Sequence, residues 1–399
     1  MAIEMTLILR PLSPLALHQK RAGVQYVETL DYIPGTALRG ALAEAYLVEH
    51  DRPDDTFQAL FLSGQVQYGD LWPTIRDKST VIIPATAQAC KRFGLKHKSS
   101  FRDSLLDAFS GPRDERCLCP VECDGKQEQC GEPLDRVQAR YLCDVADITP
   151  VAAQTRLRVS TAIERSTGTV AREMLFTQHT LTGKLKGDQN CKGGKDLVFQ
   201  GVLRLTEPAL QAKLERLVGK GTLFLGSGRS RGLGEVKVEE WQEAAPDDSL
   251  QERWKKFNDA ARRAGGDSGA CYFSLTLLSH LALRDELLRP VLDGIGPRHF
   301  GLPNSVEWAC YNESDQQVRF LSAITVAGWN AAQGLPKPDT VALERGSVLL
   351  FRCDAAQKQD VLARLAEIET ESVGERRSEG FGRVAACYPI HYECWEVKQ

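Results

Sequence analysis

The segment Arg229-Ser230-Arg231-Gly232-Leu233-Gly234-Glu235-Val236 returns later in the chain as Arg377-Ser378-Glu379-Gly380-Phe381-Gly382-Arg383-Val384. A second pattern precedes each of them, Leu12-Ser13-Pro14-Leu15-Ala16-Leu17 and Leu278-Ser279-His280-Leu281-Ala282-Leu283. Each member of the second pair follows an apolar run typical of a strand, and each glycine-rich segment leads into another such run. Two patterns that recur in one order predict a duplicated fold.

The two copies differ in length. The second spans 99 positions from Leu278 to Arg377, whereas the first spans 217 from Leu12 to Arg229. About 100 residues, beginning with a strand and ending on a helix, a glycine-rich turn and a strand, is typical of a ferredoxin-like β-α-β-β-α-β unit. The sequence therefore predicts an α+β fold with two such domains, residues 1–243 and 270–399. The first carries a large Cys-rich insertion around 85–145, and a linker helix lies within 244–269.

Local signals predict the helices of these units. The segment Ile33-Pro34-Gly35-Thr36 opens a helix for which Thr36 is the expected N-cap. A second helix is expected from Pro208 to Val218, since proline favours a helix start and Gly219 an end. Its counterpart in the second copy is expected at Ala355–Ile368, and the linker helix at Ser249–Ala264.

Composition bounds the class of protein. Of 399 residues, 42% are hydrophobic and 26% charged, which is typical of a folded soluble chain. The formal charge of −3 excludes a basic coat over the whole surface, although local basic tracks remain possible. No apolar run reaches the length of a membrane span, and residues 1–14 do not resemble an export signal. We therefore expect a cytoplasmic protein that does not bind membranes.

The first glycine-rich turn is a candidate anion site. Glycines let the backbone approach a ligand closely, and arginines offer fork-shaped donors that suit phosphate. The segment is neither a Walker loop nor a dinucleotide motif. A tight turn whose glycines serve only the backbone is the alternative. The expected phosphate contacts are Gly226, Ser227, Gly228, Arg229, Ser230 and Arg231; in the second copy, Glu375 and Glu379 dilute the charge.

Two further segments present cations. The start of the helix opened by Ile33–Thr36 offers backbone amides to an anion, with Arg39 in its first turn, unless it is only a turn and cap. The segment Thr155–Arg165 alternates polar and apolar residues. Such a strand would bury one face and present Arg156, Arg158, Ser160 and Arg165 on the other. Solvated surface charge is the alternative here.

Clustered cysteines predict a metal site. Cys117, Cys119, Cys123 and Cys130 fall in a stretch rich in glycine, proline and aspartate, and thiolates at short spacing suit zinc. We expect structural Zn²⁺ bound by these four residues, because no catalytic zinc motif lies nearby. Cys90, His97 or Cys143 could replace one of the four ligands.

These motifs together resemble the RAMP superfamily of CRISPR-associated proteins. The resemblance rests on Leu12–Leu15, on Tyr32–Leu42, on Arg158–Thr169 with Leu175-Phe176, and on Gly226–Gly234. Cys90-Lys91 and Cys130-Gly131-x-Pro133-Leu134-Asp135 make the chain most similar to the Csx-type RAMP subunit of type III-D effector complexes.

The resemblance implies RRM-like (ferredoxin-like) domains that hold CRISPR RNA inside a type III ribonucleoprotein effector complex. Implied partners are other RAMP subunits, the large polymerase-like subunit and, indirectly, target RNA. RAMP subunits that cut target RNA carry an aspartate in the loop that follows the first strand. The corresponding loop here is basic, and its Lys20 and Arg21 are expected to be further RNA contacts. Arg39 and Arg165, which lie in other motifs of the resemblance, are expected RNA contacts as well. We therefore expect a non-catalytic subunit that holds the guide, at its 5′ handle.

Two other functions stay open on sequence alone. The chain could be a RAMP endoribonuclease, with His18 as acid/base or with Glu28 or Asp31 binding a catalytic metal ion. It could also be a zinc-stabilised protein-interaction module without an RNA role.

Overall fold

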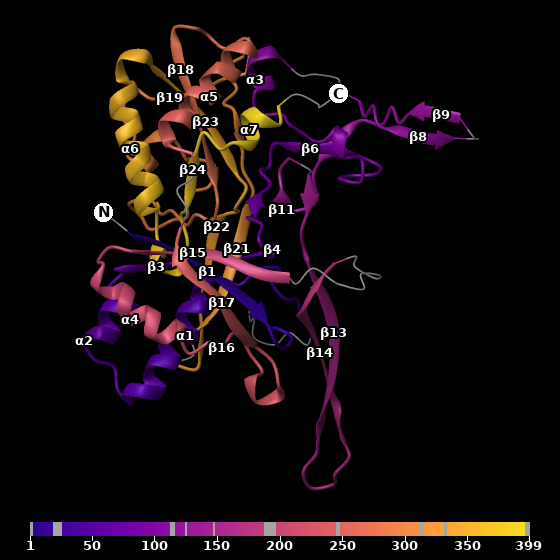
Figure 1. Ribbon diagram of the computed structural model, residues 1–399, viewed down its shortest axis with the longest axis vertical. Helices are drawn as coiled ribbons and strands as arrows, with labels where there is room; N and C mark the ends of the chain where they lie inside the picture. The colour runs from indigo at the N-terminus through magenta and orange to yellow at the C-terminus, as the bar shows by residue number, and fades with distance from the viewer. Residues whose placement is uncertain are drawn as a thin grey trace.

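The computed structural model describes residues 3–18, 26–111, 116–123, 126–146, 148–186, 197–244, 248–311, 314–330 and 333–395. Two mixed layers of sheet and helix form the body of the molecule, one above the other in Figure 1. Two hairpins project from this body in Figure 1, one formed by the strands Ala153–Ile163 and Val170–Leu185 and a shorter one formed by the strands Pro120–Cys123 and Lys126–Gln129.

The first sheet has the order β16-β17-β1-β15-β3, and β4 also pairs with β15. All its pairs are antiparallel. Its core joins Leu7 and Leu9 of β1 to Leu38 and Leu42 of α1 and to Leu214 of α4, all fully buried. The elements are β1 (Ile3–Pro11), α1 (Gly35–His50), β3 (Val66–Tyr68), β4 (Trp72–Ile75), β15 (Leu197–Leu205), α4 (Ala209–Val218), β16 (Thr222–Phe224) and β17 (Glu235–Glu243).

The second sheet repeats this neighbour order as β19-β23-β18-β24, with β20 also paired to β23. In both sheets the strand after the glycine-rich turn pairs with the first strand, which in turn pairs with the strand before the last long helix. The elements are α5 (Leu250–Arg263), β18 (Ala270–Leu277), β19 (Glu307–Trp308), β20 (Arg319–Phe320), β23 (Val348–Asp354), α6 (Lys358–Glu371), β24 (Val384–Ala386) and α7 (Ile390–Glu393).

Equivalent hydrogen bonds occur in the two copies of the repeated pattern. Ser13 Oγ accepts from the backbone N–H of Glu235 at 2.9 Å, and Ser279 Oγ accepts from that of Arg383 at 2.9 Å. The serine shared by both Leu-Ser patterns therefore joins the exit of the first strand to the start of the last strand in each copy. The repeat is visible in the sequence because the same hydrogen bond requires a serine at the same place in both copies.

The second copy departs from the expected β-α-β-β-α-β order. Between β18 and β19 the described residues contain a short 3-10 turn, Pro297–Phe300, and no α-helix. Helix α5, predicted as a linker, packs on this sheet instead: Trp254 and Phe257 are buried in one core with Phe273 of β18. The helix therefore lies before the first strand in the chain; its position along the sequence was predicted, but its packing on the second sheet was not.

The predicted helices agree with the structure in most bounds. Ser249 caps α5 in a capping box with Glu252, and Pro208 and Gly219 bound α4. The counterpart of α4 in the second copy begins as a 3-10 turn before α6. Thr36 as N-cap of α1 is wrong, since the helix begins at Gly35 and Pro34 occupies the cap.

The insertion of the first copy forms small sheets and packs on the second sheet. Leu105 and Leu106 lie in the core with β18, and the carboxylate of Asp103 meets the ring of His391 at 3.0 Å, both fully buried. The bounds are β5 (Val81–Ile82), β6 (Ala87–Cys90), β7 (Arg102–Asp103), α3 (Asp107–Ser110), β8 (Pro120–Cys123), β9 (Lys126–Gln129), β10 (Leu134–Arg136), β11 (Tyr141–Asp144) and β12 (Thr149–Pro150). The segment thus links the two halves of the molecule.

Two long hairpins complete the fold. Strands β13 (Ala153–Ile163) and β14 (Val170–Leu185) extend far from the body, with β2 (Tyr26–Val27) parallel to β14. Strands β21 (Ala323–Asn330) and β22 (Leu335–Leu343) form the corresponding hairpin of the second copy. Short turns are α2 (Asp55–Phe57), a π-helical turn at Gln58–Leu62, and 3-10 turns at Lys98–Ser100, Arg229–Arg231, Ala355–Gln357 and Arg377–Glu379. No helix among the described residues is long and apolar enough to cross a membrane.

Candidate nucleic-acid interface and metal centre

Packing of the chain itself fixes the ends of the first glycine-rich turn. Gly226 has φ +80°, and a Cβ there would lie 2.5 Å from the carbonyl oxygen of Ala16. A Cβ on Gly234 (φ +91°) would lie 2.4 Å from the carbonyl oxygen of Leu225. Glycine is therefore needed at these two positions for the tight turn of the backbone, which agrees with the alternative in which the glycines have no ligand role. They hold the middle of the turn against the segment that follows β1.

The middle of the turn is exposed. It is the 3-10 turn Arg229–Arg231, flanked by Gly228 and Gly232 in the left-handed region. Arg229 lies over the ring of Phe224, 4.2 Å from its centroid, and forms an ion pair with Glu44 of α1. Both partners of this pair are more than half exposed, so it is weak and a phosphate can replace the carboxylate.

The β13–β14 hairpin meets this turn. Arg158 Nη1 donates to the backbone carbonyl of Arg231 at 3.4 Å, so two segments predicted as RNA contacts lie together. Arg158, Arg229 and Arg231 are all exposed around this contact. Arg165 is also exposed, in the turn that joins β13 to β14.

The prediction that one face of β13 is buried is wrong. Leu157, Val159 and Ile163 are 50%, 55% and 66% exposed, and Phe176 on β14 is 45% exposed. The alternation does indicate a strand, but the hairpin leaves the body of the molecule and has no core beneath these residues. It presents cationic and apolar side chains together, a surface suited to a partner.

The chain itself occupies the predicted anion site at the start of α1. The N–H of Gly35 donates to Asp70 Oδ1 at 2.9 Å, so the free amide expected there is wrong. Burial raises the pKa of Asp70 to about 6, although the Gly35 hydrogen bond opposes the shift. Arg39 points to the second copy, where its Nη1 donates to Ser378 Oγ at 3.3 Å and lies 3.7 Å from Glu379.

The second glycine-rich turn packs against the first half. A Cβ on Gly380 would lie 2.5 Å from the carbonyl oxygen of Tyr68 of β3. Glu379 accepts from Lys337 Nζ at 2.7 Å and from Arg376 Nη2 at 2.6 Å. Burial opposes ionisation of Glu379, but Arg376 and Lys337 hold its pKa below the usual value. This turn joins the two halves and does not repeat the open geometry of the first.

The nuclease candidates have structural partners. His18 lies beside the first turn, with Nδ1 3.4 Å from Ser227 Oγ and Nε2 3.1 Å from the carbonyl oxygen of His179. Asp31 accepts from Arg345 Nη2 at 2.9 Å, and Glu28 is exposed. The predicted contacts Lys20 and Arg21 lie outside the described residues.

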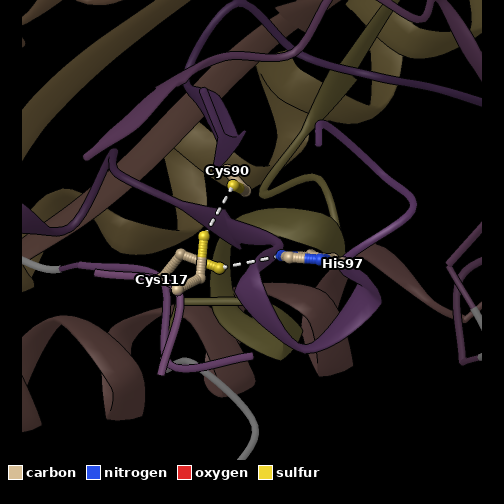
Figure 2. A group of neighbouring side chains, drawn as sticks. Cys90, His97 and Cys117 are labelled. Atoms are coloured by element: carbon tan, nitrogen blue, oxygen red, sulfur yellow. Dashed lines mark hydrogen bonds between the residues drawn. The ribbon is translucent and has the colours of Figure 1, made fainter. Parts of the chain in front are cut away.

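The cysteine cluster forms a group that could hold a metal ion. Its members are Cys90, His97, Cys117 and Cys130, whose ligand atoms all lie within 4.8 Å of one another. The sulfurs of Cys90 and Cys130 are 3.8 Å apart, and His97 Nδ1 is 3.3 Å from the sulfur of Cys117. Figure 2 shows Cys90, His97 and Cys117 pointing toward one another. Two sulfurs on one tetrahedral zinc at about 2.3 Å lie about 3.8 Å apart, which the first spacing matches.

The group differs from the predicted ligand set. Cys117 and Cys130 belong to the group, whereas Cys119 lies outside it with its sulfur 2.9 Å from Ser99 Oγ. The side chain of Cys123 lies outside the described residues. Cys90 and His97, two of the possible replacement ligands, belong to the group. The β10–β6 pairing brings Leu134, near Cys130, opposite Cys90. Strand pairing, in addition to spacing along the chain, therefore brings the members of the group together.

Burial shapes the chemistry of these thiols. It raises the pKa of Cys117 to about 12, and the hydrogen bonds from its neighbouring thiols Cys119 and Cys90 add to the shift. Burial also opposes ionisation of Cys90, but hydrogen bonds from the backbone of Phe93 and Arg92 leave its pKa below the usual value. Thiolates are the metal-binding form, so a bound cation would stabilise both.

Comparison with solved structures finds similar chains. One lies in a cryo-EM structure of the Type III-B Cmr-beta bound to cognate target RNA, with 13% identity over 95% of this chain and 96% of that chain and a TM-score of 0.46. A second, bound to cognate target RNA and AMPPnP, has 14% identity over 87% and 86% and a TM-score of 0.43. CRISPR associated protein Cas6 has 8% identity over 96% and 99% and a TM-score of 0.35.

Family assignment follows from the sequence. No curated protein matches the chain. The model of the RAMP superfamily matches residues 12–237, which include the strand exit, the opener of α1, the β13–β14 hairpin and the first glycine-rich turn. Because the match covers more than half of the 399 residues, this chain belongs to the RAMP superfamily.

Proposed function

We propose that this protein is a non-catalytic RNA-binding subunit of a type III CRISPR ribonucleoprotein effector complex. It holds the CRISPR RNA, at the 5′ handle end, as the Csx-type RAMP resemblance implies. The observation that carries this proposal is the contact of Arg158 with the backbone of Arg231, which joins the projecting hairpin to the first glycine-rich turn.

Three exposed guanidinium groups around this contact supply the chemistry. Those of Arg158, Arg229 and Arg231 are the fork-shaped donors that bind phosphate oxygens. A strand of RNA that crosses the turn and the hairpin would exchange the exposed Glu44 pair for a phosphate and release counterions. Recognition would be of the RNA backbone rather than of base edges.

The fold supports a place within an assembly. We interpret both sheets as ferredoxin-like units in which α5 replaces the missing helix of the second. Exposed Leu157, Val159 and Ile163 would be covered by a neighbouring RAMP subunit or by the large polymerase-like subunit. The metal group would hold structural Zn²⁺, because three thiols and one imidazole are typical of a structural zinc site. Its residues would keep the insertion folded, and we place the protein in the cytoplasm.

Retention of RNA tests this function. The effector complex is purified with wild-type chain, with Arg229→Gln/Arg231→Gln, or with the control Arg262→Gln/Arg263→Gln on the exposed face of α5. We expect the first variant to lose most of the bound small RNA while the control retains it. Equal RNA content in all three complexes would contradict the proposal.

A cleavage assay separates the endoribonuclease alternative. Labelled repeat RNA and target RNA are incubated with the wild-type chain, with and without Mg²⁺. We expect both RNAs to stay intact. Cleavage that is lost in His18→Ala or Asp31→Ala would instead assign an active site to the side chains near Ser227 or Arg345.

A further inference from the structure

The loop between two residues of the metal group is unusually basic. Lys91, Arg92, Lys96 and Lys98 fall between Cys90 and Ser99, a stretch without an acidic residue. All four side chains are exposed. Among the described residues, no carboxylate forms an ion pair with Lys91, Arg92 or Lys96. In a chain with a net charge of −3, Lys91, Arg92 and Lys96 are therefore a local group of exposed cations without a carboxylate partner among the described residues.

The same loop is closed at its base. Ser100 Oγ accepts from the N–H of Cys90 at 3.0 Å and donates to the carbonyl of His97 at 2.6 Å. The N–H of Gly94 donates to the carbonyl of Cys90 at 2.7 Å, and Gly94 turns the chain with φ +54°. With Cys90 and His97 both in the metal group, the loop is held at each end. Its cations are therefore presented from a preorganised backbone, which lowers the cost of binding.

Its aromatic residue is already engaged. Phe93 stacks on His97 with ring centroids 4.2 Å apart, and Arg92 lies 5.1 Å from the centre of the Phe93 ring. Phe93 and Leu95 are both partly buried, and no large apolar side chain of the loop is exposed. A protein interface needs an apolar centre, whereas nucleic-acid interfaces are much more positively charged. The loop therefore fits a polyanion better than a protein partner.

We propose that the segment 91–98, which we name the basic loop, binds the phosphate backbone of single-stranded RNA. It is a second RNA contact, separate from the first glycine-rich turn, and the proposal rests on the RNA-binding function proposed above. Lys91, Arg92 and Lys96 bind phosphate oxygens, while the metal group fixes the loop from which they project. RNA held at the turn thereby gains a contact on the insertion.

Salt-dependent binding tests the proposal. Full-length chain freed of nucleic acid is titrated into a labelled single-stranded RNA of mixed sequence across a salt series. The variants are Lys91→Gln/Arg92→Gln/Lys96→Gln and a control with equal charge loss, Lys255→Gln/Arg263→Gln/Lys358→Gln, at exposed positions of α5 and α6. Three lost phosphate contacts should flatten the slope of log K against log salt by about 2, since each contributes about 0.7 on a single strand. The control should keep the wild-type slope.

The outcomes distinguish this proposal from the proposed function. If the wild type binds RNA, Arg229→Gln/Arg231→Gln binds weakly and the loop variant matches the wild type, the basic loop is not an RNA contact. If the wild type does not bind RNA, the proposed function fails as well. A loop variant that binds RNA normally but no longer enters the effector complex would overturn the RNA assignment in favour of an acidic protein surface.

A measurement on the unaltered protein covers the case of a misfolded variant. The metal content and the thermal midpoint of the loop variant are first compared with those of the wild type, to detect misfolding. Lysines of the wild-type chain are then acetylated with and without the RNA and mapped by mass spectrometry. We expect the RNA to protect Lys91 and Lys96 but not Lys255. Equal modification of all three would overturn the proposal.

Discussion

Arg231 and Glu379 occupy equivalent positions in the two glycine-rich turns, and they have opposite surroundings. Arg231 is exposed, and its carbonyl accepts from Arg158. The side chain of Glu379 is 12% exposed and pairs with Lys337, Arg376 and Arg39. One turn is open to a ligand, and the other closes the contact between the halves. The two turns share a backbone but differ in charge at this position, and the acidic residue lies in the turn that is packed against the other half.

Replacement of Glu379 should destabilise the protein. Glu379→Gln leaves the charges of Lys337 and Arg376 uncompensated in a largely buried site, and we expect a loss of about 2 kcal/mol. The control Glu375→Gln breaks an exposed pair with Arg284 and should cost less than about 1 kcal/mol. Denaturant midpoints of both variants measure the difference. Equal midpoints would mean that the buried pairs do not hold the halves together.

Alanine at Gly234 and at Gly232 should have different costs. Both glycines have positive φ, so each alanine bears backbone strain of about 1 kcal/mol. Only at Gly234 would the added Cβ meet a carbonyl oxygen, that of Leu225 at 2.4 Å, whereas it has open space at Gly232. We expect Gly234→Ala to lower the thermal midpoint far more than Gly232→Ala. Similar midpoints would show that the turn can shift away from Leu225.

Much of the duplicated framework was predictable because it depends on local chemistry. Ser13 and Ser279 accept equivalent hydrogen bonds, so the repeat is visible in residue types. Capping of α5 by Ser249 is likewise a local signal. What depends on distant packing was not predictable. Asp70, in the link between β3 and β4 and 35 positions away, accepts from the N–H of Gly35 at the start of α1. No sequence pattern near Gly35 predicts this hydrogen bond.

The candidate sites show the same limit. Cys117 and Cys130 follow from their spacing, but Cys90 joins them through the pairing of β6 with β10. His97 follows in the loop after β6. The exposure of both faces of β13 depends on where the hairpin projects, since alternation alone predicts a strand and not what covers it. Sequence analysis could have found the basic loop from the absence of acidic residues between Cys90 and Ser99.

Acid should destabilise the protein through His280. Burial lowers the pKa of His280 to about 3, and the neighbouring cations Arg345, Arg140 and Arg376 add to the shift. The unfolded chain, with an ordinary histidine pKa of about 6.5, binds the proton more readily, so the stabilising contribution is present above about pH 6.5 and lost as pH falls toward 3. Through this one group, the free energy of unfolding falls by at most about 1.4 kcal/mol for each pH unit.

The variant His280→Gln isolates this contribution. Glutamine can still accept from the backbone N–H of Arg345, which donates to His280 Nδ1 at 3.3 Å in the native protein. Thermal midpoints of wild type and variant are compared from about pH 7 to about pH 4. We expect the wild type to lose stability more steeply than the variant. Parallel profiles would mean that the buried ring does not control the acid response.

Metal content should distinguish Cys117 from Cys119. Cys117→Ser removes a member of the four-residue group, and we expect the purified variant to lose its metal and to melt at a lower temperature. Cys119→Ser leaves all four members in place and should retain a full equivalent, because the sulfur of Cys119 lies beside Ser99 Oγ. Both are measured by elemental analysis beside the wild type. Loss of metal in Cys119→Ser with retention in Cys117→Ser would exclude the group that contains Cys117 and would favour a ligand set that includes Cys119.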